Sequence, residues 1–79
     1  MGLRFIGKDP GTDGANCPTA WVDEDAQEIL IQGWKAEEAT LAECRETGPI
    51  PDTEAVIRVP FRMADVIRKA CDAAERPAV

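Results

Sequence analysis

The side chains that could perform chemistry in this chain are carboxylates, lysines and thiols, because the sequence contains no histidine and no tyrosine. General acid–base catalysis would have to depend on these groups alone. Asp23 and Asp25 are close enough in sequence to act together, but they fall in an expected solvated turn where nothing would set one apart as acid and the other as base. We therefore expect no catalytic residues and a protein that is not an enzyme.

The glycine-rich segment Gly7–Pro18 is the stretch in which a ligand site would be expected. It contains neither the phosphate-binding pattern GxxxxGK[ST] nor the dinucleotide pattern GxGxxG. Asp9 and Asp13 approach the calcium-binding EF-hand pattern, but glycine and alanine occupy two of its other ligand positions. Aspartate and glycine are also turn formers. We expect a flexible loop at 7–18, with no metal and no cofactor.

Three cysteines, Cys17, Cys44 and Cys71, stand too far apart to form the C-x₂₋₄-C pairs typical of zinc sites. We expect Cys44 and Cys71 to be small core hydrophobes. Cys17, at the boundary of the loop and a strand, is the candidate reactive thiol. An odd number of cysteines and no secretion signal favour a reducing, cytoplasmic location.

The elements that must position these residues are predicted from hydrophobic periodicity. A β-prone composition predicts a short strand at 3–6, and a period of two in the side chains predicts strands at 19–22, 28–35 and 55–59. Gly33, inside the third of them, predicts a bulge or a close backbone approach. Helix-forming residues predict a short helix over 36–47, ended by Gly48-Pro49.

A second helix is predicted to follow Pro60, because apolar residues recur there at helical spacing. Its apolar stripe comprises Met63, Val66, Ile67, Ala70, Cys71 and Ala74. We expect this stripe to pack on Ile29, Ile31, Ile57 and Val59. The chain is then one α+β domain, 1–79, in which a small antiparallel sheet of three to four strands carries a short helix and, on one face, the C-terminal amphipathic helix. Residues 77–79 are expected to fray.

Trp21 and Trp34 are predicted to pair across a hairpin on the sheet face opposite Ile29 and Ile31, as aromatic anchors of a protein contact. Around them, residues 23–54 hold ten acidic and two basic side chains, within a net charge of −6. Such a charge run is also typical of a merely solvated surface. The candidate partner-binding residues are Trp21, Trp34, Glu24, Asp25, Glu37 and Glu38.

The same charge and the short chain limit the classes of partner. A negative field repels phosphate backbones, so we expect no direct binding of nucleic acid and instead a basic protein partner. No apolar run approaches the ~20 residues that cross a bilayer, so we expect no membrane partner. A chain of 79 residues has a thin core, and this favours a homodimer over a monomer.

The chain resembles the BldB-like family of small actinobacterial regulatory proteins, a domain of unknown function, over residues 5–70. The resemblance is carried by Gly11-x-x-Gly14-x-Asn16-Cys17, by the strand, acidic turn and strand that end in Lys35, and by a strand that runs through Pro60 into the terminal helix. Gly33-Trp34-Lys35 replaces the family's usual Asp-Ser-Lys, so the chain would be a divergent member. The resemblance implies a role in transcription regulation, beside a helix-turn-helix regulator, with self-association and without enzymatic activity.

The leading hypothesis is therefore a non-enzymatic regulatory protein that binds a protein partner, a helix-turn-helix regulator, and itself. Two alternatives remain at this point. One is a small ligand-binding or redox module that uses loop 7–18 and Cys17, and the other is an accessory subunit of a biosynthetic pathway.

Overall fold

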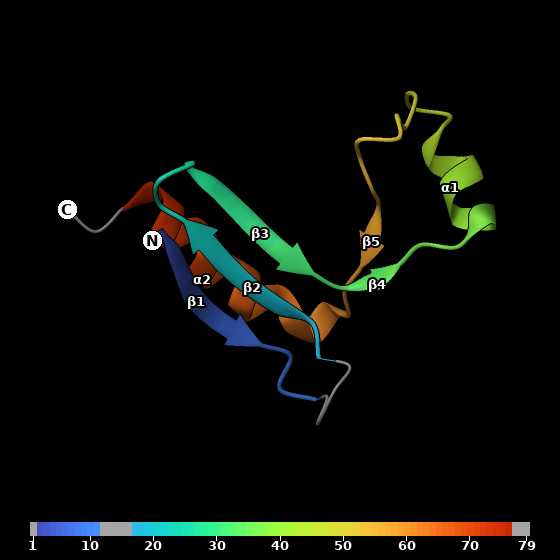
Figure 1. The fold of residues 1–79 in the computed structure, drawn as a ribbon. Helices are drawn as coiled ribbons and strands as arrows, with labels where there is room; N and C mark the ends of the chain where they lie inside the picture. The colour runs from blue at the N-terminus through green and yellow to red at the C-terminus, as the bar shows by residue number, and fades with distance from the viewer. Residues whose placement is uncertain (1, 12–16, 77–79) are drawn as a thin grey trace.

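A computed structural model describes residues 2–11 and 17–76 and shows an α+β fold built on a three-stranded antiparallel sheet (Figure 1). The strands are β1 (Leu3–Lys8), β2 (Thr19–Asp23) and β3 (Glu28–Gln32), in the order β1-β2-β3. The central part of loop 7–18 and the tail 77–79 lie outside the described residues. β1 is two residues longer than the sequence predicted, and its register shifts between Phe5 and Gly7.

A second sheet of two strands stands apart from the first. It pairs β4 (Trp34–Lys35) with β5 (Ile57–Arg58), and the short helix α1 (Glu38–Cys44) lies in the connection between them. We call residues 34–58 the arm, because they project from the sheet as Figure 1 shows. None of the residues in this range is buried. The arm therefore contributes nothing to the main core.

Gly33 is the point where the expected long strand 28–35 divides into β3 and β4. A Cβ atom at this position would lie 2.5 Å from the carbonyl oxygen of Arg58 and 2.9 Å from a Val59 methyl group. Only a residue without a side chain permits this approach of two backbone segments. The sequence predicted a bulge or a close approach here, and the close approach is confirmed.

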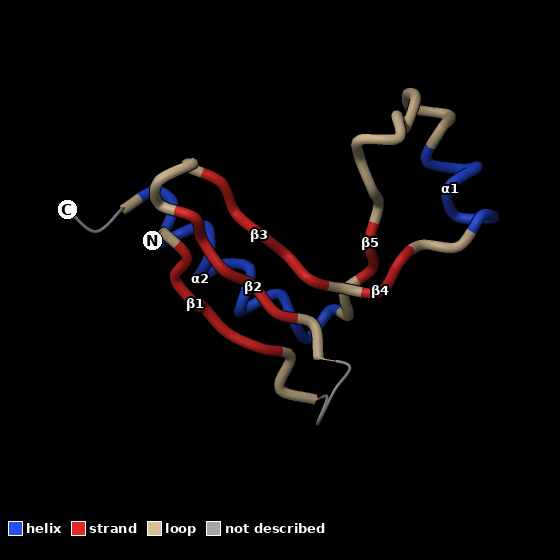
Figure 2. Tube along the Cα trace, in the orientation of Figure 1, coloured by secondary structure: helices blue, strands red, loops and turns tan. Residues whose placement is uncertain are grey.

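The chain from Phe61 onward supplies three of the five residues in the core cluster. After a 3-10 turn at Phe61–Met63, α2 (Ala64–Glu75) packs on the side of the sheet away from the viewer in Figures 1 and 2. Met63, Val66 and Ala70 are buried against Ala20 and Val22 of β2. β2 is the central strand, so the helix packs over the middle of the sheet. The small side chains of Ala20 and Val22 let the helix approach the strand closely.

The apolar stripe of the C-terminal helix, and the residues on which it packs, differ in part from the prediction. Cys71 and Ala74 are exposed, and Ala73 takes part in the core instead. Of the four expected partners only Val59 packs on this core; Ile29, Ile31 and Ile57 remain 41%, 38% and 37% exposed. The physical reason is position: β3 is an edge strand and β5 belongs to the arm, whereas the core centres on β2.

Candidate protein-interaction site

Three apolar side chains form a row across the sheet on the face that α2 leaves uncovered. Phe5 of β1 lies opposite Trp21 of β2, and Trp21 lies opposite Leu30 of β3. Residues directly opposite in antiparallel strands point to the same face and interact. Phe5 is 56% exposed, and Trp21 and Leu30 are half-buried. We call these three residues the aromatic row.

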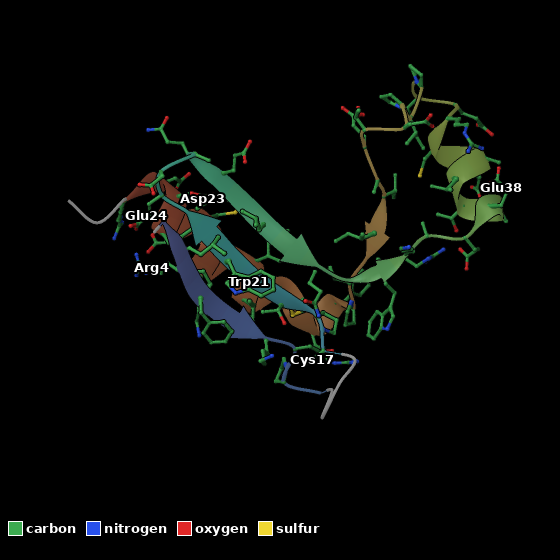
Figure 3. The ribbon with its side chains drawn as sticks, viewed as in Figure 1. Arg4, Cys17, Trp21, Asp23, Glu24 and Glu38 are labelled. Carbon is green, nitrogen blue, oxygen red and sulfur yellow. The ribbon has the colours of Figure 1, made fainter. Side chains whose placement is uncertain are left out.

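The alternation of the strands creates this row. Ala20 and Val22 point to the helix and are buried, so their neighbour Trp21 must point to the opposite side. Figure 3 shows the Trp21 side chain in front of the sheet, with α2 behind. Leu3, which pairs with Asp23 and is exposed, extends the apolar surface toward one end of the sheet. The sheet therefore has one packed face and one open apolar face.

Acidic residues border the aromatic row at the hairpin between β2 and β3. Asp23 accepts a hydrogen bond from the Ala26 N–H at 3.0 Å and so fixes the turn. Glu24 lies 3.4 Å from an Arg4 guanidinium nitrogen, and Asp25 is exposed. Figure 3 shows Arg4, Asp23 and Glu24 together at this end of the sheet. Glu24 and Asp25 thus lie at the hairpin end of the sheet, beyond Trp21, where Glu24 also lines a hollow beside Ala73 and Ala74 of α2.

The other three predicted partner-binding residues lie on the arm. Trp34 is 43% exposed and pairs with Arg58, so the expected pairing of Trp34 with Trp21 across a hairpin is wrong. The reason is the break at Gly33, which moves Trp34 into the second sheet. Glu37 and Glu38 are exposed on or beside α1, and Figure 3 shows Glu38 far from Trp21. The six predicted residues therefore form two separate groups.

The acidic residues of the arm are engaged in local contacts. Glu37 accepts hydrogen bonds from the Thr40 hydroxyl and, at 2.8 Å, from Arg58, and these contacts hold the pKa of its carboxyl below the ordinary value. Glu38 accepts one from Arg45 at 2.8 Å, which lowers the pKa of Glu38 in the same way. These carboxylates therefore stabilise the arm locally, and their charge is balanced by neighbouring guanidinium groups.

Cys17 lies at the base of the loop and is only 7% exposed. Its thiol donates to the Asp9 carbonyl at 3.7 Å, while its own carbonyl accepts from the Thr19 hydroxyl and from the Gln32 side chain. A reactive thiol requires access for its reaction partner. These contacts do not favour the prediction of a reactive Cys17, and they indicate a structural role for the residue.

Sequence reasoning missed two features. Phe5 and Leu30 are neighbours of Trp21 because of the register in which the three strands pair. The sequence does not specify that register. Asp9, interpreted as a turn former, is 2% exposed and receives a forked ion pair from Arg62 at 2.6 and 2.8 Å. The β-prone run at 3–6 was a signal that Phe5 lies in a strand, but the run does not show which residue stands opposite Phe5.

Two concave regions lie on the described surface, and one is open and the other small. A shallow groove of about 540 Å³ lies between β1 and α2 and is lined by Arg4, Arg68, Lys69 and Arg76 among others. A second hollow of about 170 Å³ lies under the β2–β3 turn. Within residues 2–11 and 17–76, no cluster of three His, Cys, Asp or Glu side chains could hold a metal ion, and no helix has the length and hydrophobicity to span a bilayer.

Comparison with known proteins adds no assignment: no protein-family model, no curated protein and no solved structure matches this chain.

Proposed function

We propose that this chain is a non-enzymatic regulatory protein that binds a protein partner through the open face of its main sheet. The observation that carries the proposal is the register of the aromatic row, in which Phe5, Trp21 and Leu30 lie side by side on the face without a helix. Large aromatic side chains at the centre of a contact supply most of the binding energy in many interfaces.

A protein partner fits this surface better than a small molecule does. Small-molecule sites are concave and bury most of their ligand. The aromatic row lies on a sheet face, and its members are exposed or half-buried. The loop around Cys17, which the ligand or redox alternative would use, has its described part closed by hydrogen bonds.

The partner that suits the surface is a basic protein. The chain has a net charge of −6, and Glu24, Asp25 and Glu28 stand near the end of the aromatic row. Such a field would speed the approach of a basic partner and oppose that of nucleic acid. A helix-turn-helix regulator presents a basic surface. We include in the proposal that the chain is a divergent member of the BldB-like family and acts on such a regulator in the cytoplasm.

The test is affinity capture from the native host's lysate with two matched variants. Phe5→Ala removes an exposed member of the aromatic row, whereas Trp34→Ala removes an exposed aromatic residue of the arm. We expect the wild-type chain and Trp34→Ala to retain a basic helix-turn-helix protein at low salt, and Phe5→Ala to lose it. High salt should weaken capture, because charge steering is screened.

Circular dichroism of the three proteins is the control, since both substituted side chains are exposed and the fold should not change. Equal capture by all three proteins would contradict the role of the aromatic row. Loss of capture only in Trp34→Ala would move the binding surface to the arm. Recovery of metabolic enzymes alone would favour the accessory-subunit alternative.

A further inference from the structure

The outer edge of β3 has no strand beside it among the described residues. β3 pairs with β2 on one side only, and its five residues run without a bulge. Ile29 and Ile31 are 41% and 38% exposed. An edge strand of this kind offers a row of backbone N–H and C=O groups to any other strand, and proteins usually protect such edges.

The opposite edge of the same sheet carries that protection. β1 contains a register shift between Phe5 and Gly7, and it carries the cationic residues Arg4 and Lys8. Bulges and basic side chains on an edge strand discourage pairing with other chains. β3 has neither, and its one charged residue, Glu28, is at its end. The sheet is therefore protected on one edge and open on the other.

We propose that β3 pairs antiparallel with β3 of a second copy of this chain, about a two-fold axis at Leu30. This register places Ile29 opposite Ile31 of the second copy, Leu30 opposite its own equivalent, and Glu28 opposite Gln32. Apolar residues then meet apolar residues on both faces, and no like charges are opposed. A two-fold axis at Ile29 would oppose Glu28 to Leu30, and one at Glu28 would oppose two carboxylates.

The arm increases the contact area of this dimer. Five paired residues on each strand bury less than the ~1,000 Å² expected of a stable interface. Because the paired strands are antiparallel, the Gln32 end of one β3 meets the Glu28 end of the other. The arm begins after Gly33, the residue next to Gln32, so each arm stands beside the hairpin turn of the other copy. Ile57, exposed on the arm, is an apolar side chain available for this contact.

The dimer proposal is independent of the proposed function, although the dimer would lengthen the aromatic row. Pairing at β3 joins two sheets of three strands into one of six. The two aromatic rows then become one continuous row, in which the Leu30 residues meet at the centre. A partner that is itself a symmetric dimer would match this two-fold surface.

A disulfide test examines the register directly, in a background in which Cys44 and Cys71 are replaced by serine and the buried Cys17 is kept. The axis brings the two Leu30 Cα atoms to about 4.5–5.5 Å, within the range of a disulfide bond. We expect Leu30→Cys to form a covalent dimer under mild oxidation. Ile31→Cys, whose equivalents would be diagonal neighbours at about 7–8 Å, should stay uncrosslinked. A mixture of Ile29→Cys and Ile31→Cys chains should form the mixed disulfide.

Sedimentation equilibrium examines the dimer without any new cysteine. We expect wild type to be a dimer and Ile29→Lys to raise its dissociation constant tenfold or more, since a lysine would face the apolar edge of the second copy. Leu3→Lys, at a more exposed apolar site away from β3, is the control and should remain dimeric. Wild type that sediments as a monomer, or crosslinking of Ile31→Cys in place of Leu30→Cys, would overturn the proposal.

The two proposals fail separately. Ile29 points to the helix side of the sheet, as its pairing with Val22 requires, so Ile29→Lys tests the dimer without altering the aromatic row. Phe5→Ala tests the row and should leave the dimer intact, because Phe5 lies on the opposite edge strand.

Discussion

Arg62 binds both carboxylate oxygens of Asp9, a residue 53 positions earlier in the chain, through Nε at 2.6 Å and a terminal nitrogen at 2.8 Å. The same carboxylate accepts the Gly11 N–H at 2.9 Å, and the Asp9 N–H donates to the Pro18 carbonyl. The pair joins the end of β1 to the start of the C-terminal helix. The hydrogen bonds that Arg62 donates to the Asp9 carboxylate also raise the pKa of the Arg62 guanidinium, because they favour its charged form.

Asp9→Asn should therefore destabilise the protein. The substitution keeps the shape of the side chain but removes the charge that receives these hydrogen bonds, and we expect the free energy of unfolding to fall by about 2 kcal/mol. Urea denaturation measures this change. Arg62→Lys keeps the charge and loses the fork, so its loss should be smaller. Equal stability of Asp9→Asn and wild type would contradict a structural role for the pair.

Gly33→Ala should destabilise the junction between the sheet and the arm. The added methyl group would lie 2.5 Å from the Arg58 carbonyl oxygen, so one backbone segment must shift. We expect the free energy of unfolding to fall by about 1–3 kcal/mol. Gly48→Ala is the matched control, because a methyl group there meets no atom within 4 Å. If the two variants unfold at the same denaturant concentration, the close approach at Gly33 is not a constraint.

Acid should loosen the arm before the sheet. The pKa of Glu37 is lowered mainly by the Thr40 hydroxyl and then by Arg58, and that of Glu38 by Arg45, from an ordinary value of 4.5. A group whose pKa is lower in the folded state stabilises that state above the unfolded pKa and ceases to do so as pH falls through the folded pKa. The effect is local, because both pairs are exposed.

Amide chemical shifts measured from neutral pH to below 4.5 would follow this change. We expect the Ala36 amide, which donates to the Val56 carbonyl at 3.1 Å, to shift with the carboxylates while amides of β2 stay constant. Glu37→Gln should remove part of the pH dependence. Simultaneous shifts throughout the arm and the sheet would mean that the arm has no separate acid transition.

Native thiol labelling should separate the three cysteines. Cys71 is exposed, Cys44 is partly buried and Cys17 is buried, so we expect Cys71 to react first with a thiol reagent and Cys17 last. Mass spectrometry after limited labelling identifies the modified position. Cys71→Ser should remove the fast phase. Rapid labelling of Cys17 would instead support the redox alternative that its burial disfavours.

The sequence predicts those parts of the fold that depend on neighbouring residues in the chain, and it does not predict the parts that depend on distant segments. The alternation at 19–22 and the helical spacing after Pro60 predict β2 and α2, because each pattern reports its own element. The close backbone approach at Gly33 was anticipated, but the division of strand 28–35 there and the move of Trp34 to a second sheet were not, since both depend on where β5 lies. The pairing of β4 with β5 alone also explains why Ile57 misses the core.

The candidate site was less predictable for the same reason. Trp21 is an obvious candidate from its type and strand position, whereas Phe5 and Leu30 become its neighbours only when register is known. Asp9 and Arg62 are 53 residues apart, and neither has a local pattern that indicates an ion pair between them. Features built by distant segments required the three-dimensional structure.

The contact of Gly33 with Arg58 and Val59 also determines where this chain can tolerate insertions and deletions. The two ends of the arm meet there, so residues 34–58 leave and rejoin the molecule at nearly one point. A segment with adjacent ends and no buried residue can be lengthened, shortened or exchanged at little entropic cost to the remainder. The arm is in effect an insertion between β3 and α2, and a short turn in its place would leave a minimal β-β-β-α domain.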